Sequence, residues 1–236
     1  MKLRDFLDYL FMTTLNNLSI ADTEVDKISE TNLKKVTAIT NNALVDLYTR
    51  FPLKLSTVII QSIDWKSNYL LDSRHSLLNG SDPIKYIVDT PMYPFKDDII
   101  RILGVTNEVG QELPLNDAEQ WASVFTPSFN TIQLTHVGYE QVFEISYQAS
   151  HPRLEVMKEL EDTLNQEVSI PFQLKEALSI KVAIDFFSAM AGQEESNKTQ
   201  VLISKFENIC AQMANENFLS TSDVSTNVKL LRRGFP

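Results

Sequence analysis

Residues 171–190 read PFQLKEALSIKVAIDFFSAM, and their apolar side chains fall on most sides of a helix. Pro171 suits the first position of that helix, because the N–H that proline lacks would have no partner there. A helix that is apolar all round is buried on several faces. We expect it to have more apolar surface than one small bundle can bury. The apolar positions are Leu174, Leu178, Val182, Ile184, Phe186 and Phe187.

Other segments of the chain show the spacing of amphipathic helices. The pattern predicts helices over residues 3–18, from Ser29 or Thr31 to Phe51, and over residues 196–217. Ser29 or Thr31 supplies the capping hydroxyl of the second of these, and Pro52 ends it. A shorter, polar helix is expected within residues 155–165.

The chain changes character between these helical segments, where short β-branched runs alternate with turn residues. Asn107–Gly110 predicts a hairpin that joins 99–105 to 111–115, and 131–134 with 142–147 suggests a second hairpin. Further strands are expected at 55–60, 65–71 and 84–88.

Together these patterns predict an α+β fold. Helices from both ends of the chain are expected to form one bundle, with a β-rich insertion of antiparallel hairpins between its halves. The predicted divisions are 1–54 and 153–218 for the bundle, 55–152 for the insertion and 219–236 for an extended C-terminal tail.

The composition argues against several classes of protein. With 31 acidic and 21 basic residues the net charge is −10, whereas a nucleic-acid reader needs clustered Lys and Arg. The single cysteine, Cys210, cannot form an internal disulfide, and we expect it to be buried and inert. Charges interrupt the N-terminal apolar residues, and no run of about 18 apolar residues occurs, so neither a signal peptide nor a membrane helix is expected.

The motifs of catalysis are missing from the sequence. No two glycines lie close enough for a phosphate-binding loop, and none of His75, His136 and His151 has a histidine partner four residues away. We therefore expect no catalytic, cofactor or metal site. An enzyme whose site gathers distant residues, such as His75, His136 and Asp117, is the least favoured hypothesis.

Some features suggest protein contacts instead. Trp65 and Trp121 could anchor a binding surface, although a lone tryptophan more often packs at the edge of a core. Residues 122–130, ASVFTPSFN, predict an aromatic, proline-containing loop between two β segments. That loop is either a packed crossover or a surface loop that grips a neighbouring protein through Phe125, Pro127 and Phe129.

The C-terminal residues 227–236 read NVKLLRRGFP and mix apolar with basic side chains. Such a segment is either a frayed terminus or a tail that becomes ordered by docking onto another subunit. The candidate docking residues are Val228, Lys229, Leu230, Leu231, Arg232 and Arg233.

In the order of its elements and in several short segments, the chain resembles the head-to-tail adaptor, or connector, proteins of short-tailed bacteriophages. The resemblance covers most of the chain in the order of its elements, and residues 1–30 and 72–83 match least. The segments that carry it are YIVDTP (86–91), IIRILGVT (99–106), QELPLN (111–116), FTPSFNTI (125–132), VFEISYQASHP (142–152), IPFQLKEAL (170–178) and the Arg-Arg-Gly near the end.

The resemblance implies a structural protein of the virion neck, assembled in the host cytoplasm, without enzymatic activity or cofactor. It implies a homo-oligomeric ring, usually of twelve subunits, between the portal protein and the tail nozzle or tube protein. Genomic DNA would pass through the ring without sequence-specific binding. The alternative hypothesis is a protein-binding or scaffold module of the host cytosol that uses the β insertion to hold a partner.

Overall fold

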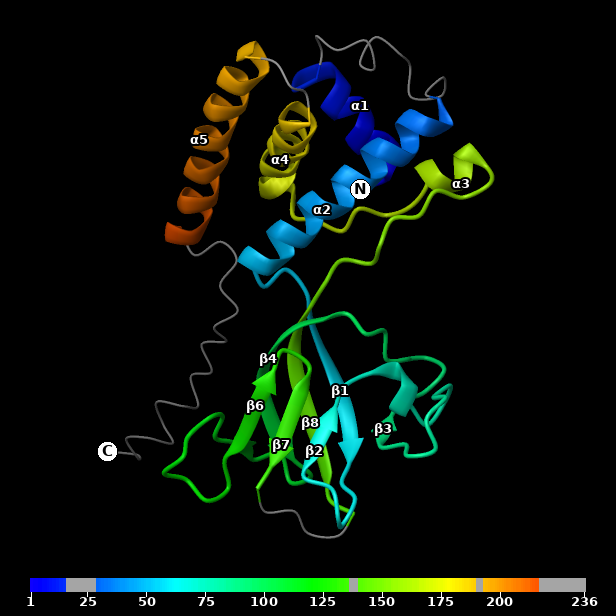
Figure 1. The fold of residues 1–236 in the computed structure, drawn as a ribbon, viewed down its shortest axis with the longest axis vertical. Coiled ribbons are helices and arrows are strands. Elements are labelled where there is room, and N and C mark those ends of the chain that lie inside the picture. The colour runs from blue at the N-terminus through cyan, green and yellow to red at the C-terminus, as the bar shows by residue number, and fades with distance from the viewer. Residues whose placement is uncertain (16–28, 136–139, 190–192, 217–236) are drawn as a thin grey trace, which may run out of the picture.

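The computed structural model describes residues 1–15, 29–135, 140–189 and 193–216, and it confirms a mixed α+β fold with antiparallel sheets. The helices gather in one lobe and the strands in another (Figure 1). The helices are α1 (Leu3–Thr13), α2 (Glu30–Arg50), α3 (Leu160–Leu164), α4 (Lys175–Ser188) and α5 (Gln193–Asn215), with short 3-10 turns at Ser73–His75 and Phe172–Leu174. The strands are β1 (Leu55–Gln61), β2 (Asn68–Leu70), β3 (Ile87–Val88), β4 (Ile99–Asn107), β5 (Glu112–Leu113), β6 (Val124–Ser128), β7 (Thr131–Leu134) and β8 (Val142–Ala149).

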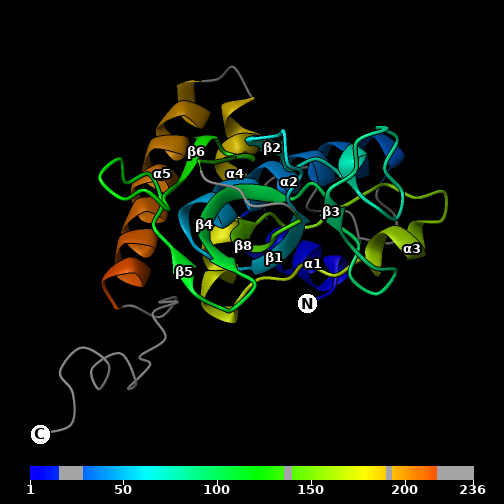
Figure 2. The ribbon, with the colours of Figure 1, turned by 90° about the horizontal axis from the view of Figure 1, so that it is seen from below.

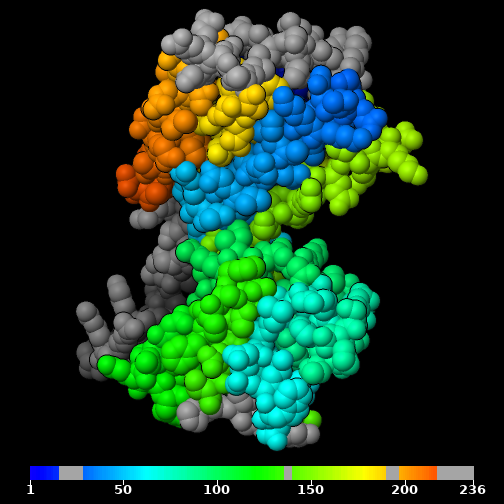
Figure 3. Space-filling model, in the orientation of Figure 1, coloured from blue at the N-terminus to red at the C-terminus, as the bar shows by residue number. Residues whose placement is uncertain are grey.

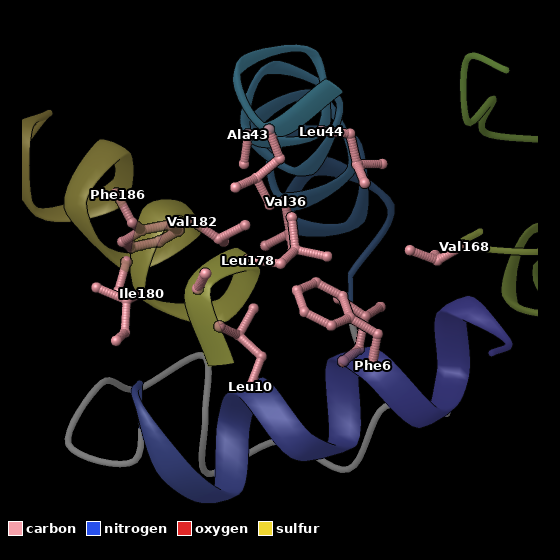
Figure 4. Packing of buried hydrophobic residues seen from close by; sticks show 14 of the residues in the cluster. Phe6, Leu10, Val36, Ala43, Leu44, Val168, Leu178, Ile180, Val182 and Phe186 are labelled. Atoms are coloured by element: carbon pink, nitrogen blue, oxygen red, sulfur yellow. The ribbon is translucent and has the colours of Figure 1, made fainter. Parts of the chain in front are cut away.

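Helix α4 occupies the centre of the helical lobe and packs against α1, α2 and α5 (Figures 1 and 4). Its side chains are buried on several faces, as predicted, and only Glu176 and Ser188 within it are exposed. The expectation that α4 has more apolar surface than one bundle can bury is wrong, because helices from both ends of the same chain cover its apolar side chains. The α4 residues in this core are Ala177, Leu178, Ile180, Val182, Ala183, Ile184, Phe186 and Phe187.

The helix ends follow the local signals of the sequence. The Ser29 hydroxyl accepts a hydrogen bond from the Asn32 N–H and caps α2, and α2 ends at Arg50, with Phe51 as its C-cap just before Pro52. Pro171 is the N-cap of the 3-10 turn that leads into α4. It therefore lies one position before the first helical position that was predicted for it. None of the helices in the described residues is both long and apolar enough to span a membrane.

The first residues of the chain are paired with residues that follow the β lobe. The Leu3 N–H donates to the Gln166 carbonyl at 2.9 Å, and the Val168 N–H donates to the Met1 carbonyl at 2.7 Å. This pairing lets α1 join α2, α4 and the C-terminal elements in a single hydrophobic core.

The β lobe contains two antiparallel sheets that share a second core. The larger has the order β3-β1-β8-β4-β5 and the smaller β2-β7-β6. Buried Tyr69 and Ile132 of the smaller sheet belong to the same cluster as Ile60 and Ile145 of the larger one.

One predicted hairpin is present in this lobe and the other is not. Strands β4 and β5 pair around the turn at 107–110, as expected. The expected hairpin of 131–134 with 142–147 is wrong, because β7 pairs with β2 and β6 while β8 lies between β1 and β4. In the centre of a sheet β8 makes hydrogen bonds along both edges, whereas a local hairpin would leave one edge unpaired.

The chain crosses between the lobes at residues 51–54 and again at 150–153 (Figure 1), and we call these two crossings the neck, where the molecule is narrowest (Figure 3). The side chain of Gln148, at the end of β8, is buried there, and its amide donates to the carbonyls of Tyr48 and Phe51. The Ala149 N–H donates to the Lys54 carbonyl at 2.9 Å. A strand of the β lobe thus caps the C-terminal end of α2.

Candidate protein-docking site

The strand registers gather several connections at the end of the β lobe that lies away from the helices. Gln61, the last residue of β1, lies opposite Val142, and Asn107, the last of β4, lies opposite Phe143. The first residue of β1, in contrast, follows directly from the neck. We define the distal end as the loops 62–67, 108–111 and 114–123.

Each of these loops presents one large apolar side chain to solvent. Trp65 is 71% exposed, Trp121 is 75% exposed and Val109 is 79% exposed. Tryptophan is enriched among the residues that dominate binding energy at protein interfaces. The two indoles therefore form a candidate docking surface rather than packing at the edge of the core.

The loop that carries Trp121 is fixed by hydrogen bonds. The Ser123 hydroxyl donates to the Pro114 carbonyl at 3.2 Å and accepts from the Asp117 N–H at 2.9 Å. The Thr135 hydroxyl donates to the Trp121 carbonyl at 3.1 Å. Because its backbone is held in this way, presenting the indole costs little conformational entropy on binding.

The turn that carries Val109 has equally specific local chemistry. The Asn107 side-chain oxygen accepts from the N–H groups of Val109 and Gln111, and Gly110 has a φ of 77°, a conformation that favours glycine. The turn therefore holds Val109 at its tip.

The loop that carries Trp65 is held by hydrogen bonds between its backbone and the buried side chain of Tyr69. The Tyr69 hydroxyl accepts from the Ile63 N–H and donates to the Lys66 carbonyl, both at 2.8 Å. These bonds close the loop beneath Trp65 and leave the indole on the surface.

A groove of about 620 Å³ lies between the turn of Val109 and the loop of Trp121. Three carboxylates, Glu108, Glu112 and Glu119, border it, and no lysine or arginine is among the described residues that line it. Its apolar lining includes Val109, Leu113, Trp121, Val124, Leu134, Val142 and Phe143. An apolar surface bordered by negative charge favours a partner that combines apolar and basic side chains.

The aromatic segment singled out in the sequence is not a loop. Phe125 and Pro127 lie in β6, and the turn that follows holds Phe129, which is exposed. Strand β6 is an edge strand of its sheet, where proline is tolerated because its missing N–H faces outward. Because Phe129 and Trp121 lie at opposite ends of β6, the structure does not join these residues into one site.

The candidate docking tail, Val228 to Arg233, lies outside the described residues, and so does His136. His75 and Asp117 each bond within their own loop. The His75 ring stacks on Tyr86 with its Nδ1 at 2.9 Å from the Ile84 carbonyl, and the Asp117 carboxylate accepts from residues 119 and 120.

The side chains of His151 and Cys210 are buried in the interior of the protein. His151 is buried against Tyr48, and burial lowers its pKa. Cys210 is buried, as predicted, and burial raises the pKa of its thiol. Within the described parts of the chain, no three His, Cys, Asp or Glu side chains are grouped to hold a metal ion.

No protein-family model matches the chain, and no curated protein matches its sequence.

Proposed function

We propose that this chain is a structural adaptor of a bacteriophage neck, which forms a ring between the portal and the tail nozzle or tube. The observation that carries the proposal is the separation of two surfaces. A helical lobe lies at one end of the molecule, and a distal end with Trp65 and Trp121 lies at the other (Figure 1). An adaptor needs two such surfaces, one for each neighbour in the assembly.

In the proposed assembly the helical lobes act as bundles that pack side by side beneath the portal, and their tails dock to the portal or to a neighbouring copy. The helical lobe presents exposed apolar side chains that such contacts would cover, among them Met12, Phe172 and Val201. The distal end then faces the nozzle or tube protein.

The charge of the chain supports a role around a DNA channel. A ring in which each subunit carries a net charge of −10 repels the phosphate backbone. DNA would therefore pass through such a ring without being retained.

The proposal is tested by mass. The chain is mixed with the portal ring of the same phage, and the complexes are measured by native mass spectrometry or mass photometry. We expect an increase of about one chain per portal subunit. The variant Trp121→Ser should bind the portal normally and lose only the next component of the tail.

No increase in mass at any protein concentration would exclude the adaptor. The distal end would then be tested as the docking site of a cytosolic binding module, by comparing proteins captured by the wild-type chain with those captured by Trp121→Ser.

A further inference from the structure

The groove between the turn of Val109 and the loop of Trp121, which we call the distal groove, has two walls of similar composition. On the wall formed by the turn between β4 and β5, Glu108 precedes Val109. On the wall formed by the 114–123 loop, Glu119 lies two residues before Trp121. Each wall therefore offers a partner one carboxylate and one exposed apolar side chain.

The floor of the distal groove is part of the hydrophobic core of the β lobe. Val124, Leu134 and Phe143 line the groove, although each of them is almost fully buried within that core. An apolar side chain that reached this floor would extend an existing core and would itself be removed from water. Such central, desolvated contacts carry most of the binding energy of a protein interface.

The carboxylates around the groove are not neutralised by the chain itself. Within the described residues, no ion pair involves Glu108, Glu112 or Glu119. Like charges around one opening repel each other, and a cation that approaches them relieves this repulsion. The charge of the groove therefore favours a basic partner.

The basic residue of the distal loops lies elsewhere. Lys66 is the only lysine or arginine in the segments 62–67, 108–111 and 114–123. Its ammonium nitrogen lies 5.3 Å from the centre of the Tyr86 ring and 5.9 Å from that of Tyr69, and Lys66 does not line the groove. Its charge is thus held over the two tyrosine rings.

The exposed indole of Trp121 adds a second means of holding a cation. Tryptophan is the side chain whose ring face attracts a basic group most strongly. A basic side chain beside Trp121 therefore finds both an aromatic face and, in Glu119, a carboxylate on the same wall.

We propose that the distal groove receives a segment of the tail nozzle or tube protein in which an apolar side chain is flanked on each side by a basic residue. The apolar side chain packs on the floor of the groove. One basic residue pairs with Glu108, and the other pairs with Glu119 beside Trp121. This assigns the chemistry of the partner at the distal end, and in that sense it rests on the proposed function.

The position of the groove favours the next tail component over the chain's own tail. Figure 2 views the molecule from below and shows β5 and β6 at the same side of the β lobe, joined by a loop that projects outward. The helical lobe lies at the other end of the molecule (Figure 1). Residues 228–233 also mix apolar and basic side chains, but in the proposed assembly they dock to the portal or to a neighbouring copy.

The test needs neither the portal nor a purified tail protein. A library of short random peptides is selected on the immobilised full chain, and the affinities of the enriched peptides are measured by calorimetry at low and at high ionic strength. We expect the enriched sequences to place an aliphatic or aromatic residue between lysines or arginines. Glu108→Gln combined with Glu119→Gln should weaken their binding about fivefold at low ionic strength and should reduce its dependence on salt.

Glu144→Gln combined with Glu155→Gln removes the same amount of charge and is the matched control. Glu144 follows the groove residue Phe143 in β8, so its side chain lies on the opposite face of the sheet, and Glu155 is an exposed residue of the helical lobe. This control should bind the peptides like the wild type, and thermal unfolding should show that both double variants remain folded.

Three results would overturn the proposal: enriched peptides without basic residues, unchanged binding by the Glu108 and Glu119 variant, or an equal loss in both double variants. A chain that enriches no peptide would overturn it as well, because a groove filled by the chain's own tail selects none. The mass measurement with the portal ring decides the adaptor function separately.

Discussion

The guanidinium group of Arg50, in the last turn of α2, forms two hydrogen bonds with the Glu207 carboxylate in α5, at 2.8 and 2.9 Å. The same guanidinium lies 4.9 Å from the centre of the Phe206 ring. Since α5 packs mainly on α4, this pair ties the helix to a further element of its lobe.

Replacing Arg50 should therefore loosen α5. Both side chains of the pair are partly exposed, so solvent screening limits the ion pair to about 0.5–1 kcal/mol, and the ring contact adds about 0.5 kcal/mol. We expect Arg50→Ala to lower the free energy of unfolding in urea by about 1 kcal/mol. Arg50→Lys should recover only part of the loss, because lysine cannot form both bonds. Lys34→Ala, in an exposed pair within α2, is the control and should cost less.

A second prediction concerns the dependence of stability on pH. The His151 Nε2 accepts from the Ser169 N–H at 3.0 Å, which requires the neutral ring, and burial lowers the pKa of His151. The unfolded chain therefore takes up a proton at a higher pH than the folded chain. The stability that depends on neutral His151 should be fully present above about pH 6.5 and should be lost progressively as the pH falls below that value.

Thermal unfolding between pH 7.5 and pH 5 measures this effect. His151→Gln, which cannot titrate, should be less stable at pH 7.5 and should lose less stability on acidification. A wild-type curve no steeper than that of the variant would assign the pH dependence to other groups.

The third prediction concerns the neck. Gln148→Leu replaces the amide side chain with an apolar one of similar size and leaves the carbonyls of Tyr48 and Phe51 without their buried donor. Unsatisfied buried groups cost about 1–3 kcal/mol, so the variant should be destabilised by that amount in urea. Thr57→Ser, at an exposed position on β1, serves as the control. Equal stability of Gln148→Leu and wild type would show that the amide is not needed at the neck.

The fourth prediction separates binding from folding at the distal end. Because Trp65 and Trp121 are exposed, Trp65→Ser and Trp121→Ser should change the free energy of unfolding by less than about 0.5 kcal/mol. The fluorescence of both indoles in the wild type should be strongly quenched by acrylamide, and binding of the distal partner should reduce that quenching. Indoles protected from acrylamide in the free chain would contradict the exposed surface.

The sequence predicted those elements whose signals are local. The Ser29 cap and the end of α2 before Pro52 depend on neighbouring residues alone. The β4–β5 hairpin depends on its own turn at Asn107–Gly110.

Pairings between distant segments could not be predicted in the same way. Alternating side chains in β7 and β8 indicate strands but do not specify partners, and the true partners of β8 begin at Leu55 and Ile99. Pro127 suggested a loop, because proline fits a strand only at an edge and the edge position of β6 depends on the whole sheet.

The candidate site shows the same division. The sequence drew attention to Trp65 and Trp121 as residues, but their common position depends on the registers of both sheets.

The two crossings of the neck have a mechanical consequence. A single linker would let one lobe rotate about the axis of the chain, whereas two crossings tied by the bond from Ala149 to Lys54 resist such torsion. A turning force applied to the distal end would then be passed to the helical lobe instead of being lost in the linker. The two lobes are therefore coupled in rotation, so that turning the β lobe about the long axis of the molecule also turns the helical lobe.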